Sequence, residues 1–227
     1  MRRILLVVVA ALSIAVGMSA QQVARVTYKS FKHYNERVEE FRHLPPVKST
    51  DIVMFGNSLT EFGGDWNNLL NTTGVVNRGI VGDDAKGMLN RLCQVLPGKP
   101  RIMFFECGMN DFSHGITPEQ VAQGVQKTIM AIRRQSPETK LYVQCNLPMS
   151  EYAGIWKTLA GKTNDVPKIN RLMKAWCEKN GITYIDMFDA FVIPGTNEMR
   201  RELTVDGLHL SPLGYKIWCS YISKYIQ

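Results

Sequence analysis

The chain has 227 residues, of which 45% are hydrophobic and 21% charged, and its formal net charge is +7. It is long enough for one α/β domain with a sizeable core, but too short for two. Its basic residues are scattered along the sequence, so we expect a solvated surface and no nucleic-acid partner.

The N-terminus has the order of a secretory signal peptide. Arg2 and Arg3 precede the apolar run Ile4–Val16, and small residues follow it. The run is shorter than the roughly 20 residues of a spanning helix. We therefore expect cleavage of residues 1–20, no stable membrane insertion afterwards, and a secreted or periplasmic protein. Residues 21–227 would form a single domain.

The next segment has apolar residues at spacings of three and four, which predicts an amphipathic helix. These residues are Tyr28, Phe31, Tyr34, Val38 and Phe41. Proline cannot continue a helix, so the helix should end before Pro45. We expect a helical extension over about residues 23–44 that packs on the outside of the domain.

Five short apolar runs follow, and their lack of polar alternation indicates parallel strands that are covered on both faces. They span residues 51–55, 74–77, 101–106, 140–145 and 182–186. Helical patterns occupy residues 118–135, 166–180 and 211–226. This alternation predicts a three-layer α/β/α sandwich with a five-stranded parallel sheet, of the flavodoxin-like kind.

The cysteines favour buried free thiols. There are five, an odd number, none forms a CxxC pair, and several lie in apolar segments. Export leaves one disulfide open as an alternative, without indicating its partners. No Cys/His cluster has metal-ligand spacing, so we expect no metal and no other cofactor.

Polar and glycine-rich segments follow the predicted strands, where ligands bind in open α/β sheets. These segments are Gly56-Asn57-Ser58, Arg78-Gly79, Gly108-Met109-Asn110-Asp111 and Asn146-Leu147-Pro148. A further one, Asp206-Gly207-Leu208-His209, precedes the last predicted helix. The side chains of these segments are the candidates for chemistry.

Three of these residues suit acyl transfer, which needs a nucleophile, a base and an acid that orients the base. Ser58 lies at a strand-to-helix turn, although a serine there is also a common helix cap. Asp206 and His209 are three residues apart, so one turn can hold the carboxylate against the imidazole. A capping aspartate followed by a surface histidine is the alternative for that pair.

Taken together, four segments resemble, in order, the sequence blocks of the SGNH or GDSL hydrolase superfamily. They are Phe55-Gly56-Asn57-Ser58-Leu59-Thr60, Asn77-Arg78-Gly79-Ile80, Gly108-Met109-Asn110-Asp111 and Val205-Asp206-Gly207-Leu208-His209. The resemblance extends over nearly the whole mature chain. It implies an SGNH hydrolase fold and a serine esterase.

The resemblance also implies a role for each matched residue. Ser58 would attack the acyl carbon, His209 would act as base and then acid, and Asp206 would orient His209. The oxyanion would be bound by the backbone N–H groups of Ser58 and Gly79 and by the side-chain amide of Asn110.

Five further residues are candidates for a place in or beside the site. Many relatives have aspartate where this chain has Asn57, whose amide oxygen can still accept backbone hydrogen bonds in the turn. The candidate substrate-binding residues are Asn57, Arg78, Asp111 and Trp156. For Arg78 the alternative is a structural ion pair, and for Asp111 a structural hydrogen bond. For Trp156 the alternative is packing in the core. Glu106 is an unusual carboxyl within an apolar run, and we expect it to be a buried carboxylate close to the site with its hydrogen bonds satisfied.

The subfamily resemblance is to platelet-activating-factor acetylhydrolase-like esterases and bacterial carbohydrate acetylesterases. Together with export, it predicts removal of small acyl groups, acetyl above all, from carbohydrates such as decorated glycans or sialic acid. The partner would then be a small-molecule or glycan ester. A lysophospholipase or thioesterase with the same triad and a catalytically silent glycan-binding protein are the alternatives, and the oligomeric state stays open.

Overall fold

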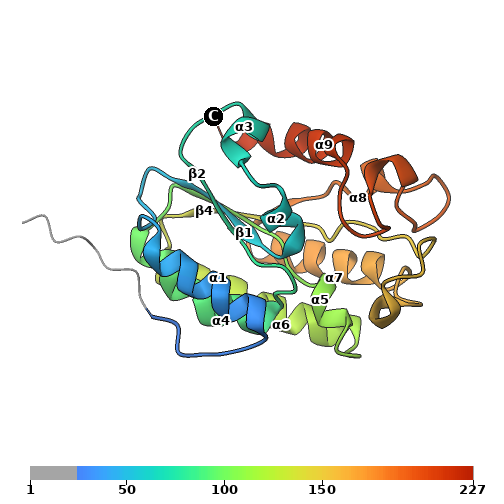
Figure 1. Cartoon of the computed structure of the whole chain (residues 1–227), viewed down its shortest axis with the longest axis horizontal. Helices are drawn as coiled ribbons and strands as arrows, with labels where there is room; N and C mark the ends of the chain where they lie inside the picture. The colour runs from blue at the N-terminus through green and yellow to red at the C-terminus, as the bar shows by residue number, and fades with distance from the viewer. Residues whose placement is uncertain (1–24, 227) are drawn as a thin grey trace, which may run out of the picture.

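Five parallel strands form one sheet in the computed structural model, which describes residues 25–226 (Figure 1). They are β1 (Ile52–Gly56), β2 (Val75–Gly79), β3 (Ile102–Phe105), β4 (Lys140–Gln144) and β5 (Thr183–Ile185), in the spatial order β2-β1-β3-β4-β5. Each lies within two residues of a predicted run. The predicted signal peptide, residues 1–20, falls outside the described residues.

Helices cover both faces of this sheet. They are α1 (Lys32–His43), α2 (Ser58–Phe62), α3 (Trp66–Leu70), α4 (Ala85–Arg91), α5 (Met109–Phe112), α6 (Pro118–Gln135), α7 (Val166–Lys179), α8 (Phe188–Phe191) and α9 (Pro212–Ile222). Helix α3 packs beside α9, and α4 beside α6, on opposite sides of the sheet (Figure 1). The α/β/α sandwich predicted from the sequence is confirmed.

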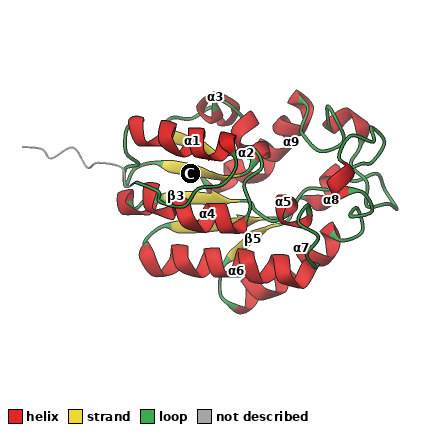
Figure 2. Cartoon of the chain, turned by 60° about the horizontal axis from the view of Figure 1, so that its bottom comes forward, coloured by secondary structure: helices red, strands yellow, loops and turns green. Residues whose placement is uncertain are grey.

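Helix α6 packs in turn against α7, and long loops gather around α8 at one end of the molecule (Figure 2). Both α6 and α7 occupy their predicted ranges to within one residue. Thr117 and Gln120 form a capping box at the start of α6, since each side chain bonds the other's backbone N–H. Within residues 25–226, no helix is long and apolar enough to cross a membrane.

Helix α1 begins at Lys32, four residues after Tyr28, the first member of the apolar pattern, and about nine after the start of the predicted extension. Tyr28 lies before the helix and packs edge-on against Tyr34, with 5.7 Å between the ring centroids. Tyr34, Val38 and Phe41 are buried on one face of α1 and form a small core with Ile80. The predicted pattern therefore identifies the packed face of the helix, while its first member belongs to the preceding segment.

The main core lies on both sides of the sheet, as the continuous apolar runs predict. All five residues of β1 are buried, and so are all four of β3. Four of the five cysteines are free thiols buried in the interior, and Cys93 is partly buried.

The carboxyl ends of the central strands meet at one edge of the sheet. Gly56, the last residue of β1, is paired with Gly79, the last residue of β2, and Phe55 is paired with Phe105 of β3. The loops that carry the candidate residues begin directly after these positions. Residues far apart in the sequence are therefore brought to one place.

Candidate active site

Ser58 is the first residue of α2 and is only 5% exposed. The helix begins there because Asn57 is its N-cap: Asn57 Oδ1 accepts a hydrogen bond from the Leu59 N–H at 2.9 Å. A Cβ on Gly56 would lie 2.2 Å from Thr60 Oγ1, so glycine allows α2 to fold back closely on β1. The serine is thus held in a tight strand-to-helix turn.

His209 joins Ser58 to Asp206. Its Nε2 lies 3.0 Å from Ser58 Oγ, and its Nδ1 lies 2.7 Å from Asp206 Oδ2. With the Nδ1 proton directed at the carboxylate, the Nε2 lone pair faces the serine hydroxyl. The three residues that sequence reasoning selected are therefore connected in the order that acyl transfer needs.

The second oxygen of Asp206 holds the turn itself. Oδ1 accepts the N–H of Leu208 at 2.9 Å and the N–H of His209 at 2.7 Å. Partial burial raises the pKa of Asp206, but the hydrogen bonds from the His209 ring and from these backbone groups outweigh burial and hold it below its ordinary value. Asp206 therefore stays ionised beside the imidazole.

A neighbouring loop supports the turn from residue 204 to residue 209. Ser150 N–H donates to the Gly207 carbonyl at 2.7 Å, and Trp156 Nε1–H donates to the Asp206 carbonyl at 3.2 Å. Gly207 has a φ of +93°, and a Cβ there would lie 2.2 Å from the Ser150 oxygen. Only glycine allows this close approach.

Two aromatic rings flank the imidazole of His209. The ring of Phe62 lies 4.9 Å away and that of Trp156 5.1 Å away, both in edge-to-face geometry. Phe62 is 53% exposed although it is a large apolar residue. The sequence analysis missed it, and its position four residues after Ser58 on the same helix was the available signal.

The structure places Asn110 beside the loop that follows β2. Asn110 Nδ2 donates one hydrogen to the Asp83 carbonyl at 2.8 Å, and the amide has a second hydrogen to donate. The Gly79 N–H donates to Asn77 Oδ1 at 2.9 Å. It is therefore not free to hold an oxyanion in this arrangement, contrary to the role that the resemblance implied.

Gly82 lies in the turn that places the Asp83 carbonyl against Asn110. The Asp83 N–H donates to the Ile80 carbonyl at 3.1 Å and closes the turn, and Gly82 has a φ of +79° at its third position. Within residues 25–226 the Gly82 N–H has no hydrogen-bond acceptor. A free backbone donor thus lies one residue from the carbonyl that Asn110 holds.

Arg78 and Asp111, two of the candidate substrate-binding residues, have structural contacts. Arg78 is 3% exposed, and its guanidinium donates to the carbonyls of Asn77 and Pro45. Asp111 is 6% exposed and accepts the Ala85 N–H. Both side chains are directed into the fold. The structural hydrogen bond describes Asp111, whereas Arg78 has no ion pair within residues 25–226 and is held by backbone carbonyls instead.

Asn57, the N-cap of α2, is also buried. Trp156, the fourth candidate substrate-binding residue, borders the site because its ring contacts that of His209. Trp66, by contrast, is 1% exposed and packs 5.2 Å from the Trp218 ring in the core.

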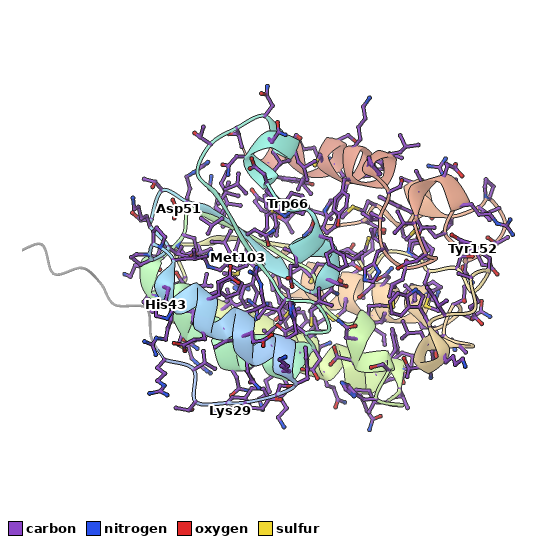
Figure 3. The ribbon with its side chains drawn as sticks, in the orientation of Figure 1. Lys29, His43, Asp51, Trp66, Met103 and Tyr152 are labelled. Atoms are coloured by element: carbon purple, nitrogen blue, oxygen red, sulfur yellow. The ribbon has the colours of Figure 1, made fainter. Side chains whose placement is uncertain are left out.

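Trp156 also lines a pocket of about 140 Å³. The other lining residues are Met149, Ser150, Glu151, Gly154, Lys157 and Ala160. Tyr152, from the same loop, lies at the end of the molecule opposite Asp51 and His43 (Figure 3). Large apolar side chains are exposed around this end: Tyr152, Ile155, Val205 and Phe62. No three His, Cys, Asp or Glu residues group as a metal site in the described part of the chain.

A flavodoxin-like sheet that carries a Ser–His–Asp arrangement at its carboxyl edge defines the SGNH class of hydrolases, and the comparisons with known proteins agree. A model of the GDSL-like Lipase/Acylhydrolase family matches residues 54–217. The alpha2 subunits of platelet-activating factor acetylhydrolase IB from Homo sapiens and Rattus norvegicus are each 26% identical over 185 residues, covering 79% of this chain and 77% of the relative.

Solved structures show the same fold. A GDSL-like lipase from Bacteroides thetaiotaomicron superposes with a TM-score of 0.73 at 20% identity, covering 85% of this chain and 96% of that one. A lipase/acylhydrolase from Enterococcus faecalis gives a TM-score of 0.59 at 23% identity, covering 78% and 95%. The chain belongs to the GDSL-like lipase/acylhydrolase family and is a hydrolase of the SGNH superfamily.

Proposed function

We propose that the protein is a serine esterase that removes acetyl and other short acyl groups from carbohydrates. The observation that carries the catalytic part is the hydrogen-bonded chain from Ser58 Oγ through His209 to Asp206, with distances of 3.0 and 2.7 Å. Ser58 attacks the ester carbon while His209 Nε2 takes its proton, and Asp206 stabilises the imidazolium that forms.

The reaction is completed by the same histidine. His209 returns the proton to the departing alcohol, which leaves an acyl group on Ser58. It then takes a proton from water, whose oxygen attacks the acyl-enzyme, and returns that proton to Ser58 Oγ as the bond to the acyl group breaks and the acid leaves. Phe62 and Trp156 border the ring and shield it on two sides.

Three donors stabilise the oxyanion in this proposal. They are the Ser58 N–H at the start of α2, the second amide hydrogen of Asn110, and the N–H of Gly82 in place of that of Gly79. The Gly82 assignment is supported by its free N–H and by the contact of Asn110 with the adjacent Asp83 carbonyl. Losing one donor of this kind costs on the order of a hundredfold in rate or more.

Two observations support an acetylated sugar as substrate. The relatives are named as platelet-activating factor acetylhydrolases, which supports the acetyl group. Trp156, whose ring lies 5.1 Å from that of His209, also lines a pocket with Glu151 and Lys157; a sugar ring can stack on the indole, and the two polar side chains can bind hydroxyl groups.

A lysophospholipase or thioesterase is the second candidate. It is supported by the exposed apolar side chains around the site, of which Ile155 is 56% and Val205 62% exposed. Such a rim can contact an acyl chain or a lipid surface.

An acyl-chain-length series that includes acetylated sugars, measured on wild type and on Ser58→Ala, separates these functions. We expect acetyl esters to be cleaved fastest, acetate to be released from acetylated glycans, and Ser58→Ala to lose nearly all turnover. Faster cleavage of long-chain esters would select the second candidate. Glycan binding without turnover of any ester would identify a silent binding protein.

The proposal includes export from the cytoplasm. It is supported by the charged, apolar and small-residue order of residues 1–20. N-terminal sequencing of protein recovered from the periplasm or medium should begin near Gln21. Recovery of uncleaved protein from the cytoplasm alone would contradict it.

A further inference from the structure

A buried carboxyl lies directly beneath the turn that carries Ser58. Glu106 follows the last residue of β3 and is 1% exposed. Its Oε1 accepts a hydrogen bond from Asn57 Nδ2 at 3.0 Å. Its backbone N–H donates to the Phe55 carbonyl of β1 at 3.1 Å, which fixes its position relative to the strand that leads into the turn.

Asn57 transmits this contact to the nucleophile. One end of its side-chain amide donates to Glu106, and the other end accepts the Leu59 N–H at 2.9 Å. Its carbonyl also accepts the Glu61 N–H at 3.0 Å. Ser58 lies between Asn57 and Leu59, so holding both neighbours sets the direction in which its side chain leaves the backbone.

Among the described residues, no cation offsets the burial of Glu106. The titratable groups that interact electrostatically with Glu106 are Asp111, Tyr215, Cys107 and Cys145, and none of them is basic. Its Oε2 is buried without a hydrogen-bond partner within the described residues. A structural role in the core would be served better by an apolar side chain, because a carboxyl buried in this way is costly.

The residue types at positions 57 and 106 suit each other. An asparagine amide can donate to the carboxyl and accept from the Leu59 N–H at the same time. An ionised aspartate at position 57 could only accept, and two carboxylates about 3 Å apart cannot both ionise readily. Asn57, at a position where many relatives have aspartate, thus suits the carboxyl of Glu106 beneath it.

We propose that Glu106 is a positioning residue that, through Asn57, holds the Ser58 hydroxyl in line with His209. The proposal rests on the assignment of Ser58 as nucleophile. It predicts that the hydrogen bond between positions 57 and 106 matters for the rate of acylation, and that its direction can be reversed.

The test compares four variants by kcat and KM for a short ester at about pH 8 and by the rate at which an organophosphonate labels Ser58. Glu106→Leu should lower kcat and labelling about tenfold or more, since small displacements of a nucleophile are costly, with less change in KM. Glu106→Gln should retain most activity because its amide oxygen still accepts from Asn57. Asn57→Asp should lose activity as the pH rises and both carboxyls ionise.

The double variant Asn57→Asp/Glu106→Gln should regain activity across that pH range, because the new amide donates to the new carboxylate. The matched control is Gln144→Leu. Gln144 is buried, follows the β4 residue paired with Phe105, and bonds the Trp218 Nε1–H at 2.6 Å. This variant should lose stability but keep kcat within about twofold, because the Gln144 side chain bonds Trp218 and not the turn that carries Ser58.

Wild-type kcat in both Glu106→Leu and Asn57→Asp would overturn the proposal, and so would a double variant no better than Asn57→Asp. If Glu106→Leu does not fold, Asn57→Asp and its double variant decide alone. A wild-type protein whose Ser58 is never labelled would overturn the nucleophile assignment as well. Normal labelling with unaffected variants would overturn only the positioning role.

Discussion

Asp206 performs a separate task with each carboxylate oxygen. Oδ2 accepts from the ring of His209, and Oδ1 accepts from the backbone of the turn. The first contact sets the tautomer of the imidazole, and the second sets the shape of the turn. The two tasks can be separated because an asparagine retains an oxygen for the turn but not a second acceptor for the ring.

Asp206→Asn should therefore fold normally and lose most activity. With the amide oxygen on the backbone N–H groups, its NH₂ faces His209 Nδ1 and favours the wrong tautomer, which costs on the order of a thousandfold to ten-thousandfold in kcat. The measurement is steady-state kinetics together with thermal unfolding. Near wild-type kcat would contradict the triad assignment, and Lys174→Ala, at an exposed surface ion pair, serves as the control.

For single residues, the sequence predicted which residue types take part in the site, but not which neighbours surround each of them. Ser58, Asp206 and His209 could be selected because each has a chemical capability that acyl transfer requires, and Glu106 lies buried by the site as expected. Gly79 could not be judged in the same way, since the acceptor of its N–H depends on where the Asn77 side chain lies. Arg78 is directed inward by contacts with Pro45 and Phe41, which precede it by more than thirty residues.

Among the elements, α2 lies unusually close to the end of β2. A Cβ on Gly79 would lie 2.1 Å from the backbone nitrogen of Glu61 and 2.7 Å from the Thr60 carbonyl carbon. Both are backbone atoms that cannot move without moving the helix. Gly79 therefore serves close packing of the helix that carries the nucleophile.

Gly79→Ala should displace α2, lowering both stability and kcat. Overpacking against backbone costs about 2 kcal/mol or more. Gly124→Ala is the matched control: it lies within α6, and the nearest atom to its new methyl would be Ala85 Cβ at 3.2 Å. Urea unfolding and kcat of both variants test this prediction, and a Gly79→Ala variant as stable and active as wild type would contradict it.

The carboxylate of Glu61, on α2, links this helix to α1. Glu61 lies 3.0 Å from His33 Nε2 and 3.4 Å from Arg37 Nε, both on α1, and accepts the Val81 N–H at 2.6 Å. Because Glu61 is the third residue after Ser58, this carboxylate connects the N-terminal helix to the nucleophile helix and to the loop that contains Gly82.

Glu61→Ala should lower the free energy of unfolding by about 1–3 kcal/mol, because it leaves the partly buried Val81 N–H unpaired and removes the ion pairs. Glu61→Gln should lose less, since its amide oxygen can still accept from Val81. Urea unfolding measures the difference. Equal losses in the two variants would show that charge, and not the Val81 contact, is what matters.

The long elements could be predicted from the sequence, while the short ones could not. Buried parallel strands leave continuous apolar runs, and α6 and α7 are long enough to show helical periodicity. Helices α2, α5 and α8 have only four or five residues, fewer than a periodic pattern needs. Their existence depends on caps and on the packing of the loops around the site.

For the whole molecule, the buried carboxyl should make stability depend on pH. Burial raises the pKa of Glu106 from 4.5 to about 7, against the lowering effect of the Asn57 hydrogen bond. Between these values the folded chain keeps a proton that the unfolded chain releases. The contribution of Glu106 to the free energy of unfolding is therefore greatest below its unfolded pKa of 4.5, and it falls as the pH rises towards 7.

Glu106→Gln cannot ionise, so its stability relative to wild type should increase between about pH 5 and about pH 8. Urea unfolding of both proteins at the two pH values measures the change. Glu138→Gln is the control, because Glu138 is exposed and its pKa lies below its ordinary value. A relative stability that does not change with pH would show that Glu106 titrates normally.

Ser58 and His209, which face each other at 3.0 Å, are 151 residues apart in the chain. During synthesis the turn of Ser58 emerges first, and His209 follows only with the last residues before α9. Domains generally fold as units, and contacts over such separations close late. Under the proposed roles of these two residues, a chain that ends before His209 should be without esterase activity.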